Sequence, residues 1–106
     1  MQDYLEQQYE KAIALYTKIV DDPTRHELIR DQAKFWLGVA YADNQQFDQS
    51  LKIFRSHRNE FPNSAFSKSD LRFEAEILLA ENETSAAKKI LSQLNTEQAR
   101  VSLLLL

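Results

Sequence analysis

The 106-residue chain contains one glycine, Gly38, and it lies inside a segment with helical spacing of apolar residues. Phe35, Leu37, Val39 and Tyr41 surround it in that pattern. Glycine inside a helix costs roughly 1 kcal/mol relative to alanine. We therefore expect Gly38 to mark a contact between two helices that leaves no room for a Cβ atom.

A second helix that could make this contact follows within a few residues. Ser50 is small, as close packing of two helices requires, and Phe47 and Phe54 lie one helical turn to either side of it. Together with Tyr41, these aromatic residues are expected to fill the space between the paired helices.

The remainder of the chain also has helical spacing and no sustained strand-type alternation. Pro23 interrupts the pattern, as proline does at helix ends. Asp3 with Glu6, and Thr24 with Glu27, have the spacing of a capping box, which predicts two helix starts. We expect six helices, over residues 3–20, 25–43, 47–60, 66–81, 84–94 and 96–106.

Residues 31–64 resemble the tetratricopeptide repeat, a helix-turn-helix unit of about 34 residues. The positions that match the family pattern are Leu37, Gly38, Tyr41, Ser50, Phe54 and Pro62. Two departures are visible. Lys34 stands at the usual tryptophan position with Trp36 two residues later, and Gln45 replaces a glycine that many repeats carry in the turn.

Weaker copies of the same spacing precede and follow this unit. Ala12 and Tyr16 correspond to Ser50 and Phe54, and Ala87 occupies the equivalent small position later in the chain. The resemblance therefore implies an all-α fold: a TPR-like α-solenoid of about six antiparallel helices in two to three repeats. We expect one domain over residues 1–106, part of a longer array or a larger protein.

Composition excludes several function classes. The net charge is −3 and no basic stripe is present, which disfavours nucleic-acid binding. The absence of cysteine excludes disulfides and thiol chemistry, but it does not distinguish a cytoplasmic from a periplasmic location. No apolar run is long enough to span a bilayer, so direct membrane insertion is not expected.

Catalytic and metal-binding patterns are absent from the sequence. His26 and His57 lie far apart and have no companion at ligand spacing, so we interpret both as surface or interface histidines. There is no phosphate-binding glycine loop, nucleophile elbow or zinc-protease helix motif. The sequence predicts a protein that is not an enzyme and needs no cofactor.

In the tetratricopeptide family, the first helices of successive repeats line a concave groove that holds a peptide or helix of a partner protein. The resemblance implies that the first of these helices contributes Phe35, either as an exposed anchor for a partner or as a packed core residue. Arg72 is expected to pair with a partner carboxylate or to remain a solvated charge. The predicted groove residues are Gln32, Phe35, Val39, Asp43, Ser69, Arg72 and Glu76.

The last residues of the chain form an apolar run that covers all sides of the helix expected there, and such a helix should be buried. Three hypotheses account for it. The chain is cut from a longer array, or this helix docks on a second copy and forms a homo-oligomer, or, as the less favoured alternative, the helix folds back on its own domain. The self-association residues would be Val101, Leu103, Leu104, Leu105 and Leu106.

A narrower resemblance concerns two short strings. Trp36 directly precedes Leu37 and Gly38, and Pro62–Ser64 ends the unit, as in the repeat variant of bacterial envelope proteins such as the Tol-Pal coordinator and outer-membrane assembly lipoproteins. The favoured function is a non-catalytic protein–protein interaction scaffold that binds a protein or peptide partner. The alternative is an accessory or self-association domain of a larger envelope protein or enzyme.

Overall fold

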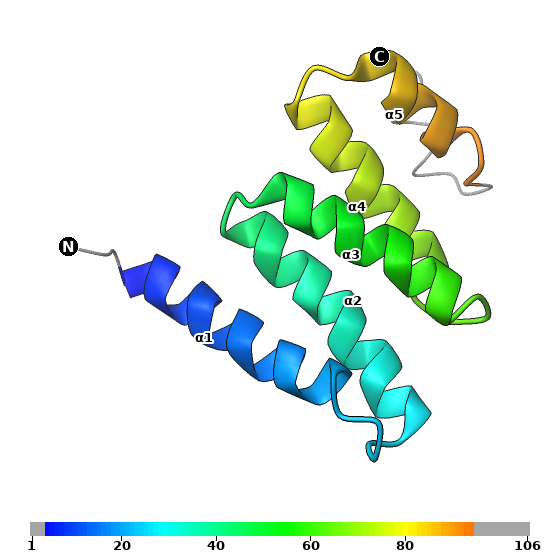
Figure 1. The fold of residues 1–106 in the computed structure, drawn as a ribbon. Helices are drawn as coiled ribbons and strands as arrows, with labels where there is room; N and C mark the ends of the chain where they lie inside the picture. The colour runs from blue at the N-terminus through cyan, green and yellow to red at the C-terminus, as the bar shows by residue number, and fades with distance from the viewer. Residues whose placement is uncertain (1–3, 95–106) are drawn as a thin grey trace.

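The computed structural model describes residues 4–94, which form five α-helices packed in sequence order (Figure 1). The helices are α1 (Tyr4–Val20), α2 (Glu27–Asp43), α3 (Phe47–Glu60), α4 (Ser67–Ala80) and α5 (Thr84–Leu91). The all-α prediction is confirmed, with five helices in place of six. The sixth expected helix, residues 96–106, lies outside the described residues. Within residues 4–94 no helix combines the length and apolar character that crossing a membrane requires.

α2 and α3 pack tightly against each other at Gly38, as its position in the sequence predicts. A Cβ atom built on Gly38 would lie 2.6 Å from Cε1 of Phe54, which is fully buried. On the same contact, the hydroxyl of Ser50 donates a hydrogen bond of 2.7 Å to the backbone carbonyl of Gly38. The missing side chain thus lets an aromatic ring pack against bare helix backbone.

Aromatic rings from three helices fill the core beside this contact. Phe54 stacks on Phe73 of α4 with ring centroids 5.6 Å apart. Phe35 of α2 lies 6.0 Å from Phe54 and stacks on Phe66, just before α4, at 4.5 Å. Burying rings of this size contributes strongly to stability and fixes the angle between neighbouring helices. The same cluster includes Ala87 of α5, so four helices share one core.

The α4–α5 hairpin reproduces the α2–α3 hairpin 37 residues further along the chain. The turn residues Gln45 and Asn82 have positive φ values of 61° and 63°, and equivalent backbone hydrogen bonds close both turns. Ala75, fully buried, takes the place of Gly38, and Leu91 takes the place of Phe54. In the second hairpin the helix residue gains a Cβ atom, and the side chain that packs against it is smaller than phenylalanine. This compensation supports the prediction that a second unit follows the first.

The start of α2 differs from the predicted capping box. α2 begins at Glu27, and Nδ1 of His26 caps it by accepting a hydrogen bond of 3.1 Å from the Leu28 backbone amide. Thr24 instead donates two hydrogen bonds to Oδ1 of Asp22, from its amide at 2.9 Å and its hydroxyl at 2.6 Å. The prediction that Thr24 starts this helix is wrong because its hydroxyl closes a tight turn after α1.

We predict that Gly38→Ala destabilises the protein by about 1–2 kcal/mol, although alanine is the better helix former. Overpacking a filled core typically costs 1–3 kcal/mol, and the Phe54 ring cannot move away because it stacks on Phe73. Urea unfolding followed by circular dichroism measures the change.

The matched control repeats Gly38→Ala in a Phe54→Leu background, which copies the Ala75–Leu91 combination of the second hairpin. There the added methyl group should be neutral or stabilising, as a double-mutant cycle reveals. Equal effects of Gly38→Ala in both backgrounds would contradict a clash with the Phe54 ring.

Candidate functional site

The outward face of α2 carries three of the predicted groove residues in one line. Gln32 and Asp43 are exposed and Val39 is half-buried against the core. Trp36 lies on the same face, four residues after Gln32, and 44% of its surface is exposed. The sequence prediction did not include Trp36 on this face, because it interpreted Trp36 only as a displaced family tryptophan. Its position at i, i+4, i+7 spacing with Gln32 and Val39 was the available signal.

Phe35, which the sequence allows as an exposed anchor or as a packed residue, is a core residue. Only 3% of its surface is exposed. Its ring contacts Phe66 at 4.5 Å, Phe73 at 5.8 Å and the neighbouring Trp36 at 5.1 Å. Of the two expectations for Phe35, the packed one is therefore correct. Trp36 is the exposed aromatic beside it.

The predicted groove residues of α4 lie on a helix that α2 contacts through the Phe35–Phe73 pair. Ser69 is half-buried, whereas Arg72 and Glu76 are exposed. The structure thus brings the two predicted helices together, and the binding of a partner there stays a prediction. The proposed self-association residues, Val101 and Leu103–Leu106, lie outside the described residues.

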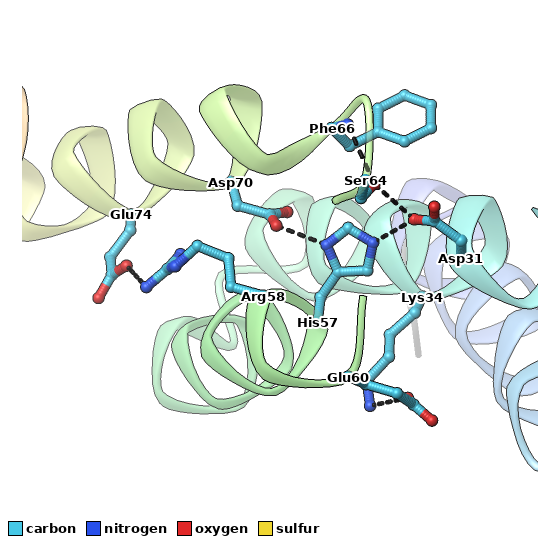
Figure 2. Close-up of polar contacts among 9 residues, drawn as sticks. All are labelled: Asp31, Lys34, His57, Arg58, Glu60, Ser64, Phe66, Asp70 and Glu74. Carbon is cyan, nitrogen blue, oxygen red and sulfur yellow. Dashed lines mark hydrogen bonds and ion pairs between the residues drawn. The ribbon is translucent and has the colours of Figure 1, made fainter. Parts of the chain in front are cut away.

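A buried polar network connects α2, α3 and α4 beneath this surface (Figure 2). His57 of α3 is fully buried between two aspartates from the neighbouring helices. Its Nε2 lies 2.5 Å from Oδ1 of Asp31 on α2, and its Nδ1 lies 2.5 Å from Oδ2 of Asp70 on α4. Of the two interpretations of His57, as a surface or an interface histidine, the surface one is wrong, because the residue is fully buried between neighbouring helices. His26, by contrast, is exposed as predicted.

The geometry around His57 requires two protons. A carboxylate oxygen only accepts hydrogen bonds, so each short contact needs a proton between nitrogen and oxygen. An imidazolium between two carboxylates meets this requirement, because both ring nitrogens then donate. Loss of one proton would leave a nitrogen lone pair facing a carboxylate in a site that excludes water, which is unfavourable.

The surroundings shift the pKa values of this network in one direction. Burial lowers the pKa of His57, but the hydrogen bonds and charges of Asp70 and Asp31 outweigh it and raise the pKa above its ordinary value. Burial raises the pKa of Asp70, and the opposing effects of His57 and Arg58 do not fully offset this. Oδ1 of Asp70 has no hydrogen-bond partner among the described residues. The network therefore retains its protons to a higher pH than free side chains would.

Two further carboxylates connect the same three helices. Glu74 of α4 is buried and pairs with Arg55 at 2.7 Å and Arg58 at 2.6 Å, both on α3. Glu60 at the end of α3 pairs with Lys34 of α2 at 2.8 Å. Lys34 is itself buried, so an ion pair to α3 occupies the position where the family pattern places tryptophan.

No cluster of three or more histidine or acidic residues suited to a metal ion occurs within residues 4–94. Each carboxylate group described above pairs with a histidine, arginine or lysine, which fits a structural role for these residues.

Comparison with known protein families agrees with the paired-helix geometry. The family model for the tetratricopeptide repeat matches residues 32–64, which include most of α2 and all of α3. These residues form a tetratricopeptide repeat, close to the predicted range of 31–64. Repeats of this kind are typically non-catalytic, and they suggest a protein-interaction scaffold. Searches of curated proteins and of solved structures find no match to the chain.

We predict that the free energy of unfolding falls as the pH rises above about 6.5, the ordinary histidine pKa. A group whose pKa is raised by folding stabilises the fold below its unfolded pKa, and this contribution is lost as the pH rises through the folded pKa. The raised pKa values of His57 and Asp70 have the same sign in this respect. Urea unfolding near pH 6 and near pH 9 measures the effect.

His26→Asn provides the control, because it changes the only other histidine and keeps a side chain that caps helices. This variant should retain the decrease. His57→Gln should lower stability by about 3–5 kcal/mol at the lower pH, since it leaves two buried carboxylates without a cation. Stability that is constant or increases between the two pH values in the unaltered protein would contradict the proposed protonation.

Proposed function

We propose that this chain is a protein-interaction scaffold that binds a peptide or helix of a partner along the outward faces of α2 and α4. The observation that carries the proposal is the exposure of Trp36 on a repeat helix, next to Phe35, which is buried. Tryptophan is enriched among the residues that dominate protein–protein affinity, and exposing 44% of its surface without a partner forgoes stabilisation.

The neighbours of Trp36 suit a binding face. Gln32 and Asp43 supply hydrogen-bonding groups on either side of it, and Arg72 and Glu76 add opposite charges on α4. This arrangement of a central aromatic residue with a polar rim is the usual anatomy of a non-obligate interface. The Phe35–Phe73 contact and the His57 network hold the two helices in a fixed relation, so the face is preorganised before binding.

The finer alternatives remain predictions. They are a role as an accessory or self-association domain, and membership of the bacterial envelope variant. The exposed apolar residues of α1, among them Tyr4 and Leu15, favour a covering surface from elsewhere, because α1 contains no buried residue. This observation fits a longer array as well as a second copy.

We predict that peptides selected on this protein from a random display library bind at Trp36. Trp36→Ala should weaken the selected peptides by about tenfold or more, the scale of an interface hot spot. Fluorescence anisotropy of labelled peptides measures the affinities. Helical content by circular dichroism confirms that the variant folds.

Leu15→Ala is the matched control, since it also removes an exposed apolar side chain but lies on α1. It should leave the affinities unchanged. Gln32→Ala gives a second variant on the α2 face that does not alter packing. Selected peptides whose affinity is insensitive to both Trp36→Ala and Gln32→Ala would overturn the proposed binding face.

A further inference from the structure

A hollow of about 380 Å³ opens at the N-terminal end of the α2 face, between α2 and the loop that joins α3 to α4. Its apolar walls come from Leu28, Phe61, Pro62 and Phe66, and Asp31 reaches it from α2. This volume lies at the lower end of the range found for small ligand sites. The hollow is therefore large enough for one long side chain of a partner.

Asp31 presents a partly free carboxylate to this hollow. Only 8% of the residue is exposed, and its Oδ1 contacts Nε2 of His57 and accepts a 2.7 Å hydrogen bond from the Ser64 hydroxyl. The Ser64 hydroxyl in turn accepts from the Phe66 amide at 3.0 Å, which directs its proton towards Asp31. Figure 2 shows that the His57 and Ser64 contacts meet at the same oxygen of Asp31. Oδ2 has no hydrogen-bond partner among the described residues.

The charges around the hollow favour a cation. Glu27 adds a second carboxylate, and no lysine or arginine contributes to the lining within residues 4–94. The two charged side chains that line the hollow, Asp31 and Glu27, are both acidic, so they make it a negative site. A cation bound at Oδ2 would form a charge-assisted hydrogen bond with a residue that is largely shielded from water.

We propose that this hollow binds a lysine side chain of the partner protein. An aliphatic stem would lie along the apolar walls, and its ammonium group would reach Oδ2 of Asp31. Arginine fits less well, because its planar fork needs two free acceptor oxygens and Asp31 offers one. Leu28 and Gln32 belong both to the hollow and to the helix face that carries Trp36, so the proposal extends the proposed binding face and rests on it.

The test uses the end-capped tripeptide acetyl-Ala-Lys-Ala-amide, whose only charge is the lysine side chain. Nuclear magnetic resonance titration of the ¹⁵N-labelled protein should give saturable shifts at residues 27–32 and 61–66. The norleucine analogue, which keeps the stem and lacks the ammonium group, should bind roughly tenfold more weakly. The arginine analogue should also bind more weakly than lysine.

Variants distinguish the hollow from general electrostatic attraction. Ala65→Phe places a large ring at the exposed edge of the hollow without touching the His57 network, and it should abolish the shifts. Asp31→Asn should also do so, provided that circular dichroism shows it folded. Glu83→Gln removes one exposed negative charge far from the proposed binding face and should leave the affinity unchanged.

Equal binding of the lysine and norleucine peptides, or unchanged binding by Ala65→Phe, would overturn the lysine site. Absence of saturable shifts would do the same. Trp36→Ala should still bind the tripeptide, because Trp36 does not line the hollow. If the tripeptide titration rejects the lysine site, the affinities of the selected peptides still test the broader binding face. If those affinities reject the broader face, the tripeptide titration still tests the lysine site.

Discussion

The arrangement of the three central helices depends on one buried histidine. His57 of α3 lies between Asp31 of α2 and Asp70 of α4, with both ring nitrogens engaged. Buried charges need partners with good geometry, because their desolvation is costly. A rotation of any one of these helices would separate an aspartate from the ring. The network thus specifies the packing, while the aromatic rings beside it supply the bulk of the apolar stabilisation.

The same network connects the core to the surface where binding is proposed. Asp31 uses one oxygen for His57 and Ser64, and the same residue lines the hollow. A partner cation at its other oxygen would therefore interact with a carboxylate whose position is already fixed, which lowers the entropic cost of binding. Phe35 has a similar double relation, since it packs in the core and touches the exposed Trp36. Residues of α2 would therefore contribute both to stability and to the proposed recognition of a partner.

The sequence predicted local contacts well and distant ones poorly. The Gly38–Ser50 contact has a sequence signal, because small residues at helical spacing imply close helix packing. The partners of His57 lie 26 and 13 residues away, and no periodicity relates them. Its position on the apolar side of α3, one turn after Phe54, was the available sign of burial. Thr24 misled because a turn and a helix cap use the same side chain in the same way.

The most direct test of the account is the protonation of His57 in the folded protein at neutral pH. Proton and ¹⁵N nuclear magnetic resonance of the imidazole ring should reveal two strongly downfield, slowly exchanging protons, one in each contact with an aspartate. His57→Gln identifies them by their disappearance. One such proton, or a ring that exchanges rapidly with water, would contradict a buried cation that joins α2, α3 and α4.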